Sequence, residues 1–132
     1  MSHRILQPAG WARPKGYSNG ISARGRTIVL AGQIGWDAQQ RLVGSDLVTQ
    51  ARQALRNIVA LLAEDGARPE HIVRRTGYVT DRAAYLAAAA DLGAAYREVL
   101  GKHFPAMTAV EVSALMEADA VVEIEATAVV PE

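Results

Sequence analysis

The sequence predicts a single α+β domain in which two helices cover one face of a mixed β-sheet. Two stretches with helical spacing of apolar residues alternate with segments rich in β-branched residues, in the order β-β-α-β-α-β-β. A short extra strand is expected at Ile5–Leu6. The length of 132 residues fits one domain over residues 1–132, because no repeat or linker divides the chain.

The first two strands are expected at Ile21–Ala23 and Thr27–Leu30, joined by a glycine-containing turn at Ala23–Arg26. The second run is rich in β-branched residues and ends in two small residues, Ala31 and Gly32. Small residues at the end of a buried strand indicate that the backbone there approaches another group closely. We therefore expect a close contact at the end of this strand.

The first helix is predicted between Asp46 and Glu64. Its apolar residues recur at gaps of three and four, which places them on one face of an amphipathic helix. Ser45 or Asp46 can cap the start of the helix, and Gly66 can end it. The apolar face consists of Val48, Ala51, Leu55, Ile58, Val59 and Leu62.

A strand at Ile72–Val79 and a second helix from about Arg82 to Leu100 are expected next. Thr80 or Asp81 can cap this helix, and Gly101 closes it. Its many alanines would let the helix pack closely against a sheet. The apolar stripe consists of Tyr85, Leu86, Ala89, Leu92, Tyr96 and Leu100.

The last third of the chain is predicted to form two strands, Met107–Leu115 and Val121–Val130. The link Met116–Ala120 between them suits a hairpin or a short connection. Apolar and mixed residues alternate along the final strand, so its two faces differ. We expect the apolar face to meet the helices. The mixed face, which carries Glu123 and Glu125, would meet solvent or another subunit.

Composition argues against several classes of protein. Lys+Arg and Asp+Glu are both 14, so the formal net charge is zero, which disfavours a nucleic-acid partner. The absence of cysteine excludes disulfides and thiolate sites, and the three scattered histidines give no spacing typical of a metal site. The N-terminal residues include no apolar stretch of the length of a signal peptide or a membrane span. We therefore expect a cytoplasmic protein with no membrane partner.

Several local patterns occur in the order and at the spacing of one protein family. Each alone is weak, but together they cover nearly the whole chain and resemble the RidA/YjgF family. The matching segments are Gly16–Gly20 (G-Y-S-N-G), Ala31–Ile34 (A-G-Q-I), Gln50–Ile58 (Q-A-R-Q-A-L-R-N-I), Phe104–Ala106 (F-P-A), Val110–Val112 (V-E-V) and Val122–Ala128 (V-E-I-E-A-T-A).

The resemblance implies a chorismate-mutase-like two-layer sandwich that forms a homotrimer around a central β barrel. It also implies three pockets at the subunit boundaries, each lined by residues of two neighbours. Better-studied relatives hydrolyse reactive enamines and imines, such as 2-aminoacrylate, to a keto acid and ammonia. Such hydrolysis needs water and proton transfer, so no cofactor is expected. The expected partners are other copies of the chain and a small-molecule ligand.

Three positions keep the family's site residues. The resemblance places a pocket tyrosine at Tyr17, a glycine whose backbone borders the pocket at Gly32, and the water-handling glutamate at Glu123. A carboxylate beside a polarised C=N carbon can accept the proton of the attacking water. Glu123 is therefore the expected catalytic residue. Trp36 is equally compatible with lining the pocket and with packing at an interface.

Four expected ligand-binding positions depart from the family's pattern toward apolar residues. Met107 stands where the family has a carboxylate-binding arginine, while Ala31, Ala109 and Ala90 stand in place of a serine, a cysteine and an asparagine. An arginine fork fixes a carboxylate through two parallel hydrogen bonds, and a buried carboxylate without a partner is costly. The sequence thus predicts a drier pocket without a fixed cation. It predicts a poor 2-aminoacrylate deaminase that favours neutral ligands.

Two functions remain open from the sequence. One is hydrolysis of an imine or enamine, and the other is a non-catalytic trimer that binds or senses a small metabolite. Ribonuclease activity, for which the family is also named, is disfavoured by the neutral charge. Met107 is also compatible with core packing alone. The Arg74–Arg75 pair could supply a substitute cation, although a neighbouring strand does not by itself place the guanidinium correctly.

Overall fold

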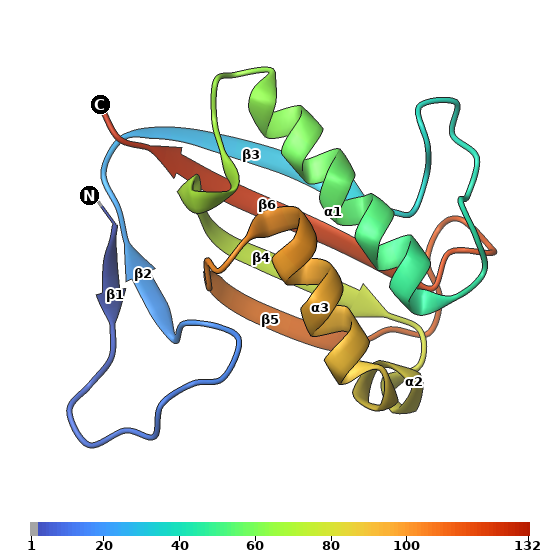
Figure 1. Ribbon diagram of the computed structural model, residues 1–132, viewed down its shortest axis with the longest axis horizontal. Helices are drawn as coiled ribbons and strands as arrows, with labels where there is room; N and C mark the ends of the chain where they lie inside the picture. Colours follow the sequence, from blue (N-terminus) through green and yellow to red (C-terminus); the bar gives the residue numbers. More distant parts are fainter. Residues whose placement is uncertain (1–2) are drawn as a thin grey trace.

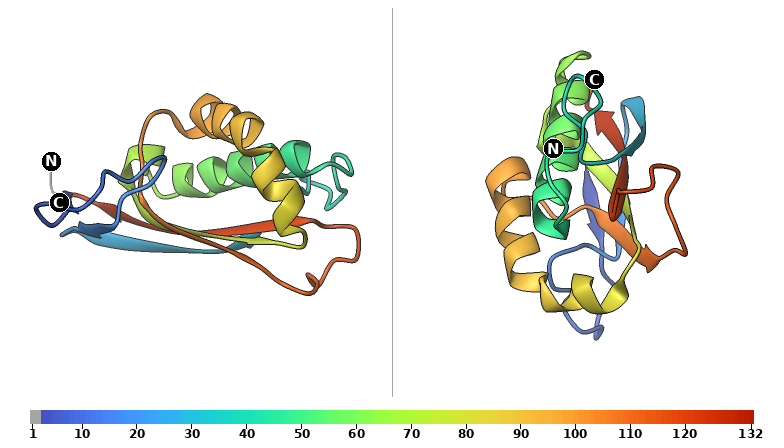
Figure 2. Two further views of the ribbon diagram at one scale, coloured as in Figure 1. Left: turned by 90° about the horizontal axis from the view of Figure 1, so that it is seen from below. Right: turned by 90° about the vertical axis from the view of Figure 1, so that its right-hand side faces the viewer.

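The computed structural model describes residues 3–132 as two layers, with helices covering one face of a four-stranded sheet (Figures 1 and 2). The predicted α+β class is confirmed, and so is the extra strand near the N-terminus. The elements are β1 (Arg4–Leu6), β2 (Gly20–Ser22), β3 (Arg26–Gln33), α1 (Leu47–Ala63), the 3-10 turn η1 (Pro69–His71), β4 (Ile72–Val79), α2 (Arg82–Ala87), α3 (Ala89–Leu100), β5 (Ala106–Glu111) and β6 (Val122–Val130).

The order of strands in the main sheet is β3-β6-β4-β5. The final strand, β6, lies in the interior of the sheet and is antiparallel to both β3 and β4, while β4 and β5 are parallel. A hairpin between the last two strands was one of the expected connections. It is wrong, because β4 separates β5 from β6 and residues 112–121 cross between them.

The two strands predicted before the first helix are both present, but they belong to different sheets. β2 pairs with β1 in a separate two-stranded sheet and not with β3, which pairs with β6. The glycine turn between β2 and β3 is nevertheless required. Gly25 has φ 143°, and a Cβ there would lie 2.0 Å from the carbonyl oxygen of Val130. This turn therefore redirects the chain from one sheet to the other.

The alternation along β6 sorts its side chains as predicted. Val122, Ile124, Ala126 and Ala128 are buried against the helices, where they form the core with residues of α1 and α3. The intervening side chains lie on the opposite face of the sheet, which no helix covers (Figure 2). This uncovered face is called the open face below.

Helix α1 begins where the sequence predicts, because the side chain of Asp46 accepts a hydrogen bond from the backbone N–H of Thr49. Gln50, in the first turn, is fully buried. Its amide makes three hydrogen bonds that hold the loop after β3 and the loop before β6, both at one end of the sheet, to the helix. The partners are the carbonyl oxygens of Gly44 (2.9 Å) and Asp119 (3.0 Å) and the backbone N–H of Val121 (2.9 Å).

The second predicted helix is divided in two at Ala88, which ends α2 and begins α3. Figure 2 shows α2 inclined from α3 toward the sheet. The bend keeps Tyr85 of α2 packed on the core while Leu86 remains 60% exposed. A run of alanines carries no side chain large enough to reveal such a bend in advance. Within residues 3–132, no helix has the length and hydropathy needed to cross a membrane.

Candidate functional site

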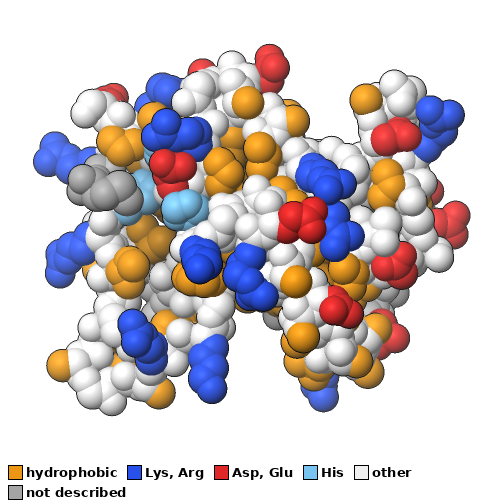
Figure 3. Space-filling view, in the orientation of Figure 1, with side chains coloured by type: hydrophobic (Ala, Val, Ile, Leu, Met, Phe, Trp, Pro, Cys, Tyr) orange, Lys and Arg blue, Asp and Glu red, His pale blue; other side chains and the backbone are white. Residues whose placement is uncertain are grey.

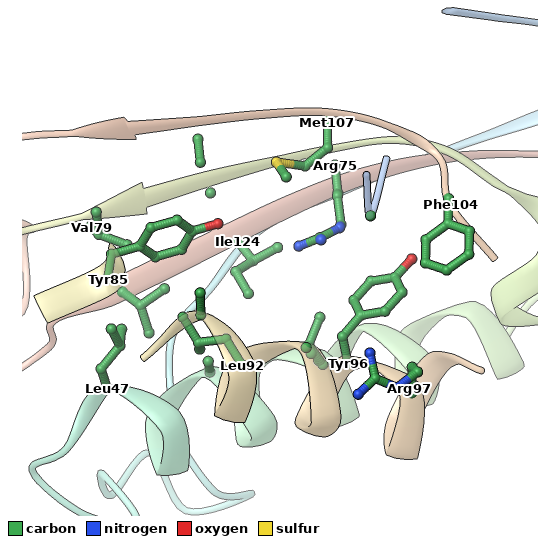
Figure 4. A pocket seen from close by; sticks show the side chains of 18 of the residues that line it. Leu47, Arg75, Val79, Tyr85, Leu92, Tyr96, Arg97, Phe104, Met107 and Ile124 are labelled. Atoms are coloured by element: carbon green, nitrogen blue, oxygen red, sulfur yellow. The ribbon is translucent and has the colours of Figure 1, made fainter. Parts of the chain in front are cut away.

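A cavity of about 220 Å³ lies between α3 and the sheet (Figure 4). Its floor is formed by the helix-facing side chains of β4, β5 and β6, and its roof by residues of α1, α2 and α3. Lys15 and Gly16 close one end. Their segment is fixed by the next structured residue, Ser18, whose backbone N–H donates to the carbonyl oxygen of Pro105 (3.1 Å) and whose hydroxyl donates to that of Phe104 (2.5 Å).

Met107 and Ala109 both line this cavity. Strand register explains why. Met107 pairs with Arg75 of β4, Ala109 pairs with Gly77, and Gly77 also pairs with the buried Ile124. Directly paired residues of neighbouring strands share a face of the sheet. The two predicted ligand-binding positions on β5 therefore face the helices, together with the guanidinium of Arg75.

Arg75 is the polar centre of the cavity. Its Cζ lies 4.3 Å from the ring centroid of Tyr96, a cation–π geometry, and its Nε is buried with no hydrogen-bond partner in the described residues. The hydroxyl of Tyr96 donates instead to the carbonyl oxygen of His103 (2.5 Å). Burial raises the pKa of Tyr96, and the nearby Arg75 charge opposes this rise. Tyr96 is therefore a neutral surface for the guanidinium.

The charge of the cavity is positive. Lys15, Arg75 and Arg97 line it, and no Asp or Glu is among the described lining residues. Figure 3 shows Lys and Arg side chains bordering the hollow between the N-terminal hairpin and α3. The expectation of a pocket without a fixed cation remains a prediction for the pocket between subunits, whereas this cavity within one chain contains a cation that comes from β4 and not from β5. In the sequence, this cation was indicated by the Arg74–Arg75 pair. Which of the two side chains faces the helices depends on the register of β4 in the sheet.

Glu123 lies on the open face, across the sheet from Met107. A Cβ added to Gly32 would lie 2.0 Å from its Oε2 and 2.8 Å from its Cδ. The predicted close approach at the end of this strand is thus confirmed, and the group that approaches is the Glu123 side chain. Ala31, exposed at the same end of β3, is adjacent.

Glu125 has a separate environment on the open face. The hydroxyl of Tyr78 donates to its Oε1 at 2.7 Å. This hydrogen bond raises the pKa of Tyr78, with smaller contributions from burial and from the charge of Glu125. Glu125 is therefore engaged by a neighbour, whereas Glu123 has no hydrogen-bond partner among residues 3–132.

The remaining predicted site residues are more scattered. Tyr17 is half-buried between the cavity-lining Gly16 and the anchored Ser18. Trp36 lies in the loop after β3, where its carbonyl oxygen accepts from the Asn57 amide (2.9 Å). Ala90 is exposed on α3 and lies outside the cavity, although its neighbour Ala89 lines it. Within one chain, Met107 and Ala109 therefore lie together in the cavity. Ala31, Gly32 and Glu123 form a second, separate group.

The family model described as Endoribonuclease L-PSP matches residues 11–130, nearly the whole chain. The chain belongs to this family. The L-PSP family includes the RidA and RutC proteins with which the chain shares its sequence and fold. It is 34% identical to a RutC family protein of Synechocystis over 99% of both chains. It is 35% identical to a 2-iminobutanoate/2-iminopropanoate deaminase of Salmonella typhimurium over 86% of each.

Solved structures of the L-PSP family share the architecture. A Rid family protein of unknown function from Yersinia pestis superposes with a TM-score of 0.87 at 33% identity, covering 98% of this chain and 100% of that one. No group of three His, Cys, Asp or Glu side chains among residues 3–132 could hold a metal ion.

Proposed function

We propose that the protein hydrolyses an imine or enamine to a carbonyl compound and ammonia, in pockets completed by a second subunit of a homotrimer. The observation that carries this proposal is the free carboxylate of Glu123 held over Gly32, at a site that the motifs of the family point to. Relatives about 35% identical are named 2-iminobutanoate/2-iminopropanoate deaminases. The open face offers the apolar and charged surface that a barrel of three sheets would cover.

The positions of the two residue groups support a pocket between subunits. Glu123 and Gly32 lie on the open face, and Met107 and Ala109 lie on the helix-facing side at the edge strand β5. A sheet separates the groups within one chain, so a ligand touching both would have to contact two chains. In the proposed trimer, the edge of β5 in one subunit meets the open face of its neighbour.

The proposed reaction uses water and one carboxylate. Water adds to the carbon of the protonated imine while Glu123 accepts a water proton. Glu123 then returns this proton to the nitrogen of the resulting amino alcohol. The C–N bond breaks with its electron pair leaving on ammonia, and the hydroxyl group passes its proton to the Glu123 carboxylate as its oxygen becomes the carbonyl oxygen. The products are a carbonyl compound and ammonia, and no redox change occurs.

We propose further that 2-aminoacrylate is a poor substrate. Met107 carries no charge at the position where the family has its arginine, so a short imino acid held there would lose its bidentate contact. A fully lost contact of this kind corresponds to a large fall in rate, because each ~1.4 kcal/mol of transition-state stabilisation is a factor of ten. Small ligands without the reach to another cation are therefore disfavoured.

The test is turnover of imines generated by amino-acid and amine oxidases, with semicarbazide competing for them. Glu123→Gln should lower turnover by roughly 10²- to 10⁴-fold, the usual contribution of a general acid–base group. Glu125→Gln is the matched control, since it lies two residues along on the same face and should retain activity. Equal loss in the two variants would contradict the role of Glu123.

The second candidate function is binding without catalysis. The positively charged cavity favours it as well, because a ligand can be held there without reaching Glu123. A wild-type protein that binds a ligand and clears none of the imines would support this candidate. Size-exclusion chromatography with light scattering tests the trimer, and a monomer at micromolar concentration would count against both candidates.

A further inference from the structure

The cavity between α3 and the sheet contains a charge that the chain itself does not neutralise. Within residues 3–132, Arg75 belongs to no ion pair, and its Nε is buried without a hydrogen-bond partner. Buried polar groups in native proteins nearly always have a partner. A guanidinium cannot relieve its burial by losing a proton. The unsatisfied group therefore indicates a missing acceptor.

The geometry of Arg75 specifies what kind of acceptor fits. Tyr96 covers one face of the guanidinium plane at 4.3 Å, while its hydroxyl is committed to the carbonyl oxygen of His103. The Nε–H at the edge of the plane has no hydrogen-bond partner in the described residues. Figure 4 shows the guanidinium projecting from β4 into the space between Tyr96 and Tyr85. An acceptor in that plane with two oxygens, a carboxylate, matches the arginine fork.

We propose that Arg75 is the anion-binding residue of this cavity and that the ligand is a small carboxylate with an apolar or aromatic body. Leu92, Phe104 and Ile124 supply apolar walls around the guanidinium. The volume of about 220 Å³ exceeds the ~150 Å³ of an engineered cavity that holds benzene. Lys15 and Arg97 at the lining add attraction for an anion, and no described acidic lining residue opposes it.

This inference rests on the proposed function where it names a substrate class. Arg75 lies on the strand beside Met107, and neighbouring strands are about 4.8 Å apart. The cation of this cavity therefore lies one strand further from the sheet edge than residue 107, where the family has its arginine. In a 2-imino acid the C=N carbon is bonded to the carboxyl carbon, so a carboxylate bound at Arg75 would keep that carbon inside the cavity. A ligand with an apolar or aromatic spacer between its carboxylate and its C=N carbon can place that carbon at the pocket mouth. The substrate class is therefore a carboxylate that carries the imine at the far end of an apolar or aromatic body.

The experiment is calorimetric titration of the intact protein with phenylacetate and with its neutral isostere phenylacetamide. Phenylacetate should bind about 10- to 100-fold more tightly, as expected for hydrogen bonds to a charged group. Arg75→Met keeps much of the apolar stem and should remove this preference. Arg74→Met is the matched control, because Arg74 is exposed on the open face of the same strand and its loss should leave the preference intact.

Three results would overturn the inference. They are equal affinity of wild type for the two probes, no binding of either at millimolar concentration, and an equal effect of the two arginine substitutions. A proton–nitrogen NMR spectrum of wild type provides a readout that does not depend on the folding of a variant. The Arg75 Nε–H resonance should shift with phenylacetate and not with phenylacetamide, and a resonance unmoved by phenylacetate would reject the contact.

The binding assay also separates this inference from the proposed catalysis. Selective phenylacetate binding without imine turnover would retain Arg75 as the anion site and reject the deaminase. Imine turnover that is unchanged in Arg75→Met would retain the deaminase and reject the substrate class proposed here.

Discussion

Substitution by alanine should affect different properties at two glycines near the end of β3, lowering turnover at Gly32 and stability at Gly35. Gly32 and Gly35 both have backbone angles that alanine can adopt, since neither lies at positive φ. They differ in what a new methyl group would meet. At Gly32 the nearest atom is the Glu123 Oε2, 2.0 Å away, at the end of a flexible side chain. At Gly35 it is the Cα of Gln50, 2.7 Å away, in the backbone of α1.

The magnitudes follow from these contacts. In Gly32→Ala, the Glu123 carboxylate must retreat by about 1.5 Å from its 2.0 Å separation to reach an ordinary non-bonded distance. A displacement of this size at a reacting group can cost about 10²-fold in rate. The stability should change little, because a carboxylate on a half-buried side chain can rotate into solvent. Activity is thus expected to fall while the melting temperature stays near that of wild type.

In Gly35→Ala, the collision is with a helix backbone that is fixed by the buried Gln50. Overpacking of this kind costs about 1–3 kcal/mol. For a chain of this length that corresponds to a melting temperature lower by roughly 5–10 °C. Turnover per folded molecule should be affected less than in Gly32→Ala, because Glu123 is not the group displaced.

The assay pairs imine turnover with thermal unfolding on both variants. A Gly32→Ala protein with wild-type turnover would refute the reasoning, since it would mean that Glu123 does not need its position over Gly32. A Gly32→Ala protein that melts as low as Gly35→Ala would refute the assumption that the Glu123 side chain yields easily.

Three further predictions concern stability. Gln50→Leu leaves three backbone groups without their hydrogen-bond partner and should lower the free energy of unfolding in urea by about 3 kcal/mol. Gln53→Leu, which loses one hydrogen bond to Asn57, should lower it by about 1 kcal/mol, and equal losses would contradict the buried network. The pKa of Asp46 is held below its usual value, chiefly by the hydrogen bond from the backbone N–H of Thr49. The stabilisation that the ionised Asp46 gives to the fold is therefore complete above about pH 4 and is lost as the pH falls through the lowered pKa. The free energy of unfolding should decline more steeply with acid in wild type than in Asp46→Asn, and parallel curves would reject this. Ser18→Ala removes the buried hydroxyl that donates to the carbonyl oxygen of Phe104 and should increase amide exchange of residues 15–18 without altering exchange in α1. Unchanged exchange at residues 15–18 would show that the backbone bond to Pro105 suffices.

The helix α1 could be predicted almost completely because its signals are local. The three- and four-residue gaps define its buried face, and the cap at Asp46 acts within three residues of itself. Strand partners are different, because period-two alternation assigns side chains to faces and contains nothing about which strand lies alongside. The buried face of β6 was therefore predictable, while its place between β3 and β4 was not.

The anion site was missed for a more specific reason. Ile72 and Val79 are both buried on the helix side, yet they are seven positions apart, an odd number, so strict alternation would place them on opposite faces. A register shift between Ile72 and Arg74 resolves the conflict. Counting back from Val79 places Arg75 in the cavity, whereas counting forward from Ile72 places Arg74 there. Without the bulge, the sequence cannot choose between the two arginines.

The interior position of β6 makes one segment responsible for the continuity of the sheet. Residues 122–130 join β3 to the β4–β5 pair and pack under α1. Without β6, two strand edges and the apolar face of α1 have no partner. A partly unfolded state in which β6 has detached therefore divides the sheet into two pieces and exposes it to chaperones and proteases.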